Sequence, residues 1–438
     1  MTKPPRFSIL IPTSGRAHLI RMAVESVLTQ TFRDFELIVV DSSGSEEAKE
    51  ATLYSDDARV RYVESPKSPP LITWDFAARQ ATGEYVMWCD DDNFLLPFAL
   101  DLFDRTIRNT SAEVITASHF YYYDDRHPRL FLRNSVGVVP WNGSVQAIDL
   151  SSALREIFGF SRRGPGQKYP RFHFSATVFS RQILERAFAR LGFVMIAEMP
   201  NIHSLQPILF AFAKSSFFVD IPMVIVGRLG VSMSQIWSTA ARARFKKRPF
   251  IAQLSPVKGY TRMNGILENY LRTKKLLPDL LGDIPIGYER FAEQYVSELF
   301  YLDTGVVAAL RNWKELFAFL KTLNAGYQKV LAARAKKYMF LWPFLNLIRR
   351  MRLHIVWRML YGVCIRRKED KRSAVQKFQG NKEFVIPFDK KYPSLRSLSL
   401  LGRHIEKIVQ DELGIHLQEQ AARLFPGSRG EGVTLGQK

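Results

Sequence analysis

Short apolar segments alternate with amphipathic ones over the first hundred residues, and this alternation constrains the fold more than any other feature. Segments 7–12 (FSILIP), 35–41 (FELIVVD), 60–64 (VRYVE) and 84–90 (EYVMWCD) have the length and composition of strands. The first, second and fourth are almost continuously apolar, as strands covered on both faces are. Apolar pairs recur every four residues across 19–28, which predicts a helix. Strands alternating with helices predict a parallel sheet, so the chain is expected to begin with an α/β domain.

Three consecutive carboxylates follow the fourth of these strands. Asp90, Asp91 and Asp92 repel one another, so their place at the end of a buried strand makes sense mainly if a positive group arrives there. A divalent cation is the first candidate. Asp41 likewise ends the second strand, and ligands of open α/β sheets bind at the carboxyl ends of strands. The alternative for the triplet is an acidic cap on a helix formed by the apolar residues 94–103.

The net charge of +20 is confined to the second half of the chain. Residues 1–230 contain 25 of the 62 basic and 25 of the 42 acidic side chains, so the whole excess lies after residue 230. This asymmetry predicts a neutral, catalytic-type half and a basic half that faces a polyanion.

The chain is long enough for two or three domains, and its later part has a different pattern. From about residue 112 the sequence is β-like and turn-rich, and beyond about 240 helical spacing dominates. No segment reaches the roughly 18 uninterrupted apolar residues of a spanning helix, and no signal peptide is recognisable. Two cysteines, Cys89 and Cys364, give no reason to expect an oxidising compartment, so a cytoplasmic location is expected.

Three motifs together resemble the inverting family 2 glycosyltransferases with a GT-A fold. They are FSILIPTSGR, SVLTQTFRDFELIVVDSS and ATGEYVMWCDDDNFLLP, in that order and at suitable spacing. The resemblance covers residues 5–110 closely and 111–235 loosely. It implies a Rossmann-like mixed sheet that binds a nucleotide-diphosphate sugar, with UDP-sugars favoured. The first turn, PTSGR, lacks the glycine-rich loop of dinucleotide-binding proteins, which makes a dehydrogenase a poor fit.

The resemblance also implies roles for individual residues. Asp90-x-Asp92 resembles the DXD motif of the family, with Asp92 as ligand of Mn²⁺ or Mg²⁺ and Asp90 near the ribose or a water on the metal. Such a metal stabilises the charge that builds on the leaving diphosphate. Donor-binding residues by resemblance are Pro12, Thr13, Arg16, Asp41, Trp74, Asp75, Asp90 and Asp91.

Several of these assignments have an alternative. Residues 12–16 could be only a turn and a helix cap at Ser14. Trp74 could be ordinary core. Asp75 replaces an Asn that many family members carry there, which removes a hydrogen-bond donor and adds a charge.

Inverting transfer needs a base that takes the proton of the acceptor hydroxyl. Related sequences place an acid about where Asn201 stands, and an amide cannot accept that proton. We expect the role to move to Glu198 or to His203. His173 is a further candidate for contact with acceptor or metal.

No acidic residue occurs between Glu315 and Glu369, where Trp, Phe, Tyr and Leu alternate with Arg and Lys. This pattern favours contact with an anionic membrane surface, and Pro343 argues against a single span. A buried helix pair with a solvated basic face is the alternative. Nucleic acid is a poorer fit, because the basic residues are mixed with bulky aliphatic ones.

The sequence thus predicts a GT-A catalytic domain over 1–235, a basic, mainly α-helical domain over 236–425 that faces membrane or acceptor, and a disordered tail over 426–438. The predicted activity is transfer of a sugar to a glycan or lipid-linked saccharide in surface polysaccharide or glycoconjugate synthesis, peripheral to the inner face of the cytoplasmic membrane. The alternatives are a non-catalytic nucleotide- or glycan-binding relative and a polyanion-binding scaffold at a membrane surface.

Overall fold

The computed structural model describes eleven stretches of the chain. These are residues 3–66, 70–127, 132–161, 173–196, 204–229, 252–258, 261–301, 306–350, 374–379, 384–387 and 401–425. The predicted tail over 426–438 lies outside them.

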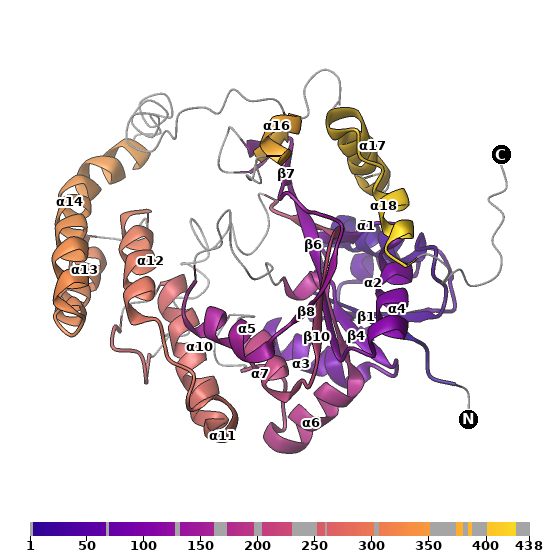
Figure 1. The fold of residues 1–438 in the computed structure, drawn as a ribbon, viewed down its shortest axis with the longest axis horizontal. Coiled ribbons are helices and arrows are strands. Elements are labelled where there is room, and N and C mark those ends of the chain that lie inside the picture. Colours follow the sequence, from indigo (N-terminus) through magenta and orange to yellow (C-terminus); the bar gives the residue numbers. More distant parts are fainter. Residues whose placement is uncertain are drawn as a thin grey trace.

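A mixed sheet organises the structure (Figure 1). Its main path runs β11-β7-β6-β9-β4-β1-β2-β3, and β10 joins it through β6, β5 and β8. The strands are β1 Phe7–Thr13, β2 Phe35–Asp41, β3 Val60–Glu64, β4 Tyr85–Trp88, β5 Asn93–Leu95, β6 Val114–Tyr123, β7 Ser135–Val138, β8 Val145–Ile148, β9 Thr177–Ser180, β10 Ser216–Gly227 and β11 Phe384–Pro387.

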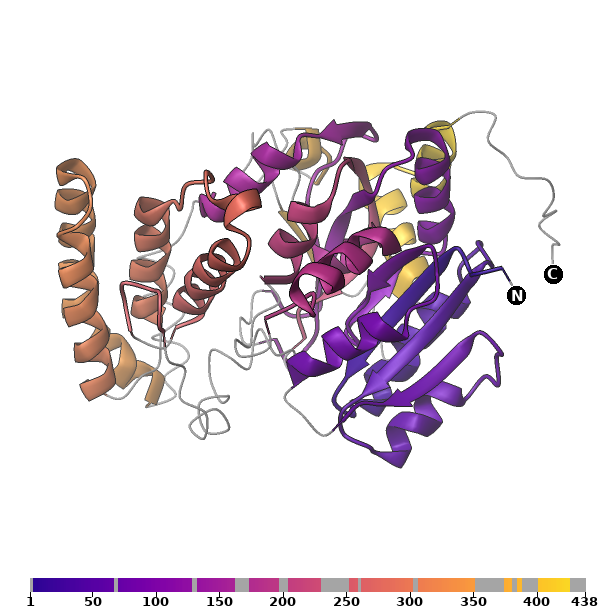
Figure 2. The ribbon, with the colours of Figure 1, turned by 90° about the horizontal axis from the view of Figure 1, so that it is seen from below.

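Strands β3, β2, β1 and β4 pair parallel with one another, as the alternating pattern predicted, and β10 pairs parallel with β6. Strand β9 then inserts antiparallel between β4 and β6. Every residue of β1 is buried, because helices cover both faces of the sheet at this strand. The arrangement confirms the predicted α/β fold class with a mixed sheet (Figure 2).

Two hydrophobic clusters fill the two sides of the sheet. Helices α1 Ala17–Leu28, α2 Glu46–Leu53 and α4 Ala99–Thr110 contribute to one cluster. Helices α3 Pro70–Gln80, α5 Leu150–Phe158, α6 Arg181–Leu191 and α7 Leu205–Phe212 contribute to the other.

The second cluster continues into the helices that follow β10, which lie on the left of Figure 1. They are α10 Arg262–Leu276, α11 Pro278–Leu281, α12 Tyr288–Tyr301, α13 Val306–Leu320 and α14 Ala325–Arg350. They confirm that this part of the chain is mainly helical. Pro343 lies within α14. In the part of the chain that the structure describes, every helix is too short or too polar to span a membrane.

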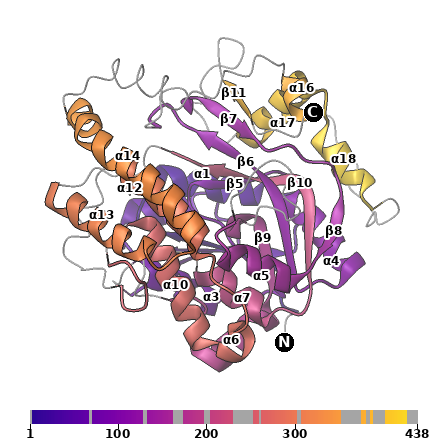
Figure 3. The same cartoon turned by 60° about the vertical axis from the view of Figure 1, so that its left-hand side comes forward.

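The C-terminal elements return to the first cluster (Figure 3). Strand β11 pairs antiparallel with β7, next to α16 Ala374–Gln379. Helices α17 Leu401–Leu413 and α18 Leu417–Arg423 bury apolar residues against the sheet, and Trp141 donates its Nε1–H to Gln420 Oε1 at 2.7 Å. The domain boundary near residue 235 stays a prediction, but part of the chain beyond it packs on the N-terminal sheet.

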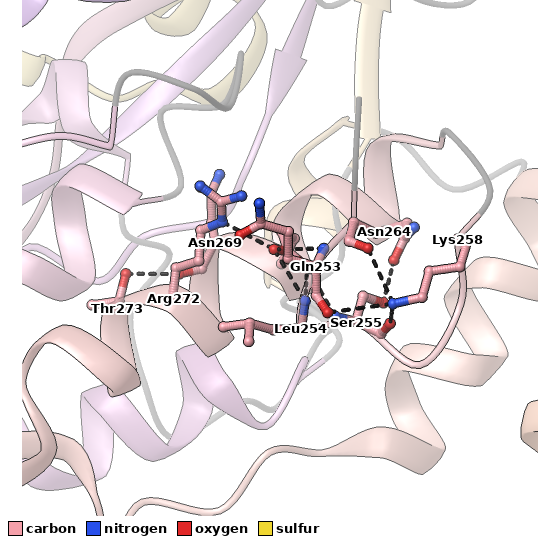
Figure 4. A network of polar contacts seen from close by, with 10 residues as sticks. Gln253, Leu254, Ser255, Lys258, Asn264, Asn269, Arg272 and Thr273 are labelled. Carbon is pink, nitrogen blue, oxygen red and sulfur yellow. Dashed lines mark hydrogen bonds and ion pairs between the residues drawn. The ribbon is translucent and has the colours of Figure 1, made fainter. Parts of the chain in front are cut away.

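A polar network around the buried Glu268 holds residues 252–258 against α10 (Figure 4). The carboxylate of Glu268 accepts backbone N–H groups from residues 253–255 and the Nε–H of Arg272. Lys258 donates from Nζ to the carbonyl of Ser255 at 2.9 Å. Burial opposes the ionised form of Glu268, but these bonds outweigh it and its pKa is lowered. The network therefore fixes the start of the helical part.

Candidate functional site

The predicted residues meet at the carboxyl edge of the parallel strands. Thr13 at the end of β1 lies opposite Asp41 at the end of β2, and Leu10 lies opposite Trp88 at the end of β4. The aspartate triplet begins two residues after Trp88. The strands therefore bring Thr13, Asp41 and the triplet to one edge, where ligands of such sheets bind.

Asp91 is the buried centre of this group. Its carboxylate accepts the Oγ1–H of Thr13 at 2.6 Å and the Nε–H of Arg16 at 3.0 Å, and Nη2 of Arg16 contacts its other oxygen. The guanidinium thus binds Asp91 with two parallel bonds, the strongest form of ion pair available to a carboxylate. Asp91 is occupied by these two residues of the PTSGR motif.

Asp90 and Asp92 flank this ion pair. Nη1 of Arg16 lies 3.7 Å from Oδ2 of Asp92. Burial, then the charges of Asp92 and Asp91, raise the pKa of Asp90 well above its ordinary value, while Arg16 opposes the shift. Among the described residues, no group of three or more His, Cys, Asp and Glu side chains is arranged to hold a metal.

The backbone of Asp92 is fixed from the opposite strand. Gly227, the last residue of β10, donates its N–H to Asp92 O at 3.0 Å and to Asn93 Oδ1 at 3.1 Å. A Cβ on Gly227 would stand 2.0 Å from Asp92 O. Asn93 in turn donates to Ser175 Oγ at 2.7 Å. The approach of β10 to the triplet therefore requires a glycine.

The triplet does not cap a helix. It leads into β5, and α4 begins only at Ala99 with Phe98 as N-cap. Helix α1 likewise begins at Ala17 with Arg16, not Ser14, in the N-cap position. The two capping alternatives are therefore wrong, and other reasons are needed for the acidic triplet and for Arg16.

Asp41 is fully buried and is held by the loop that follows it. Its carboxylate accepts backbone N–H groups from Ser43 and Gly44 at 2.9 and 3.1 Å, the Ser43 hydroxyl, and the Tyr62 hydroxyl at 2.9 Å. The serine and glycine turn is a cradle for this carboxylate. Asp41 therefore shapes the wall of the edge beside Thr13.

Pro12 is buried within β1, one residue before this edge. Trp74 and Asp75 lie on α3 and have partners in the second hydrophobic cluster. Trp74 packs edge-on against Phe174 at 4.9 Å, and Asp75 accepts the backbone N–H of Val194 at 2.7 Å. None of the contacts described for Trp74 or Asp75 reaches the aspartate triplet.

The residues considered for the base, Glu198 and His203, lie outside the described residues, as does Asn201. His173 is described. It precedes a short 3₁₀ turn over Phe174–Ala176, and its ring lies 5.1 Å from that of His119 on β6. Only residues 114–116 of β6 pair with β9, and His119 lies further towards the carboxyl end of β6. Because β9 is antiparallel to both β4 and β6, this end of β6 lies at the same edge of the sheet as the triplet.

Several residues at this edge were not singled out in the sequence. Gly227 and His119 lie on long strands, and no motif around either residue indicates a role at the site. His18 lies in the first turn of α1, where burial and the charges of Arg126 and Arg16 lower its pKa despite Asp91. The turn after Asp41 has a local signal, because an Asp followed by Ser and Gly favours a turn in which the Asp carboxylate accepts backbone N–H groups of the next residues.

The N-terminal part of the chain is similar to known proteins. Residues 8–188 match the family model described as Glycosyl transferase family 2. The chain is similar to a GalNAc(5)-diNAcBac-PP-undecaprenol beta-1,3-glucosyltransferase of Campylobacter jejuni. The two are 36% identical over 100 residues, and these residues make up 22% of this chain and 32% of that protein. The chain is also similar to a hyaluronan synthase of Pasteurella multocida. The two are 30% identical over 104 residues, and these residues make up 23% of this chain and 11% of that protein. The chain thus spans a third or less of these relatives.

Among solved structures, the chain is similar to residues 1–349 of S. aureus TarS in complex with UDP-GlcNAc. The identity is 13% and the TM-score is 0.49, over 79% of this chain and 92% of that chain.

Proposed function

We propose that the chain is an inverting, metal-dependent glycosyltransferase, because residues 8–188 match glycosyltransferase family 2, as the three motifs predicted. It transfers a sugar from a nucleotide diphosphate, with UDP favoured, to a glycan or a lipid-linked saccharide. The observation that carries the proposal is the meeting of Thr13, Arg16 and the aspartate triplet at one carboxyl edge.

The donor would lie along this edge. The cradle around Asp41 supports a nucleotide pocket bounded by β1 and β2, with Pro12 and Thr13 as its floor. In this proposal Asp41 acts mainly through the loop that it holds, because its carboxylate already accepts bonds from Ser43, Gly44 and Tyr62.

A divalent metal fits the triplet when it arrives with a diphosphate. Mg²⁺ is commonly bound through one or two carboxylates, with the remaining ligands from substrate phosphates and water. In this proposal Asp92 and Asp90 would provide those carboxylates, and Asp91 would keep its bonds with Arg16 and Thr13. When bound, Mn²⁺ or Mg²⁺ would neutralise charge on the departing diphosphate.

The acceptor side is proposed more broadly. The matched relatives are named for a lipid-linked saccharide acceptor and for a polysaccharide product, which supports surface polysaccharide or glycoconjugate synthesis. Glu198, with His203 as second candidate, stays our prediction for the base that takes the acceptor proton.

We also propose that the protein binds peripherally to the inner face of the cytoplasmic membrane. The exposed face of α14 supports this, because Val330 is 62% and Phe340 83% exposed, beside the exposed Lys329, Lys336 and Lys337. Flotation with anionic liposomes tests the proposal. We expect co-flotation that weakens in Phe340→Ser, and equal recovery with neutral and anionic liposomes would refute it.

Turnover tests the activity. Purified protein is incubated with Mn²⁺, a panel of UDP- and GDP-sugars and lipid-linked saccharide acceptors, and release of the nucleoside diphosphate is measured. We expect release from a UDP-sugar that depends on acceptor and metal and is absent in Asp92→Asn. Nucleotide binding without turnover on any acceptor would favour the non-catalytic alternative, and absence of both would favour a scaffold.

A further inference from the structure

Arg16 is a cation already present in the acidic site. It forms two bonds with Asp91, and its Nη1 lies 3.7 Å from Asp92 Oδ2. The side chain of Arg16 is 24% exposed, against 2% for Asp91 and 9% for Asp92, so Arg16 is the most exposed of these three charged side chains.

This position has a consequence for the order of binding. A divalent ion that approaches Asp92 alone meets a fixed positive charge within a few ångströms, and charge repulsion at this distance is substantial even with protein screening. A nucleotide diphosphate adds negative charge and phosphate oxygens, which offset the repulsion and complete the ligand set. The two ligands then favour each other's binding reciprocally.

We infer that Arg16 couples the metal to the nucleotide, so that the site binds a divalent cation weakly alone and tightly together with a nucleoside diphosphate. The inference rests on the proposed function and assigns Arg16 a positioning role in it. Thr13 supports this role, because its hydroxyl holds Asp91 at 2.6 Å and so keeps the partner of Arg16 in place.

Electron paramagnetic resonance of free Mn²⁺ tests the inference without any turnover. Mn²⁺ is titrated into the wild type, Arg16→Met and Arg16→Lys, with and without saturating UDP. For the wild type we expect UDP to strengthen Mn²⁺ binding by about 100-fold, towards the upper end of typical couplings. Arg16→Met should bind Mn²⁺ alone about tenfold more tightly than the wild type, because it lacks the competing charge.

The remaining variants separate charge from structure. Arg16→Lys keeps the charge but loses the paired geometry, so it should bind Mn²⁺ alone as weakly as the wild type; a merely structural role would affect both substitutions alike. Arg21→Met, on the helix that Arg16 precedes, is the matched control, since the Arg21 guanidinium stacks over Tyr54 at 4.5 Å. It should leave Mn²⁺ binding unchanged.

Three results would overturn the inference. They are equal Mn²⁺ affinity of the wild type with and without UDP although UDP itself binds, no gain in folded Arg16→Met, and an equal gain in Arg21→Met. The first can be read even if Arg16→Met does not fold. Failure of UDP and GDP to bind under any condition would instead refute the proposed function, and Mn²⁺ binding by Arg16→Met alone would still test the role of Arg16.

Discussion

Gly227→Ala should displace the aspartate triplet although residue 227 lies far from it in the sequence. The new Cβ would stand 2.0 Å from Asp92 O, and real Cβ atoms essentially never approach closer than 3.0 Å. The two backbones must therefore separate by about 1 Å, because the obstacle is a carbonyl oxygen and not the end of a flexible side chain. The separation lengthens the hydrogen bond from Gly227 N to Asp92 O, now 3.0 Å.

The expected losses of stability and of transfer rate in Gly227→Ala follow from the overpacking and from its position beside the triplet. Overpacking in a well-packed region costs about 1–3 kcal/mol of unfolding free energy. A misplacement of about 1 Å among reacting groups can cost about 100-fold in rate. We therefore expect Gly227→Ala to stay folded, to melt several degrees lower, and to lose about 100-fold in transfer rate.

Thermal melting and the nucleotide-release assay measure these two effects. Gly326→Ala in α14 is the matched control, because the closest atom to its new Cβ is a side-chain oxygen of Asn324 at 3.5 Å. It should melt at or slightly above the wild-type temperature, since Ala favours a helix more than Gly does. A Gly227→Ala variant with wild-type stability and rate would refute the close packing of β10 on the triplet.

Two further predictions concern parts of the chain that position the sheet. Ile408→Ala, in a fully packed position of α17, should lower the free energy of unfolding by about 2–5 kcal/mol in urea, and a loss below about 1 kcal/mol would contradict the return of the C-terminal helices. Burial would raise the pKa of Glu36, but hydrogen bonds from Ser8, Thr82 and Arg61 outweigh it and lower the pKa from its ordinary value. Glu36 therefore stabilises the fold above about pH 4.5 and loses this contribution as the pH falls through its folded-state pKa. The difference in unfolding free energy between wild type and Glu36→Gln should shrink between about pH 6 and about pH 3.5. A constant difference would contradict these hydrogen bonds to Glu36.

Much of the N-terminal half could be predicted from local sequence. The strands at residues 7–13, 35–41 and 60–64 were recognisable because their side chains are dominated by apolar and β-branched types. The carboxyl edge followed from the parallel order, which brought Asp41 and the triplet together before any contact was known.

The contacts that hold the site together depend on long-range packing and were not predictable. The bond from Gly227 to Asp92 spans more than a hundred residues. The two hydrogen bonds from Arg16 to Asp91 likewise join residues that are distant in the sequence, beside the bond from Thr13 to the same carboxylate. The helical pattern after residue 400 indicated helices but not the surface that they cover, because an amphipathic face is compatible with many partners.

A calorimetric titration of UDP, with GDP as comparator, with and without Mn²⁺, on the wild type and on Asp92→Asn tests the proposed donor site most directly. We expect UDP binding that requires Mn²⁺ and is lost in Asp92→Asn while the variant remains folded. Failure of the wild type to bind either nucleotide, or equal binding by Asp92→Asn, would contradict a donor site at the three aspartates.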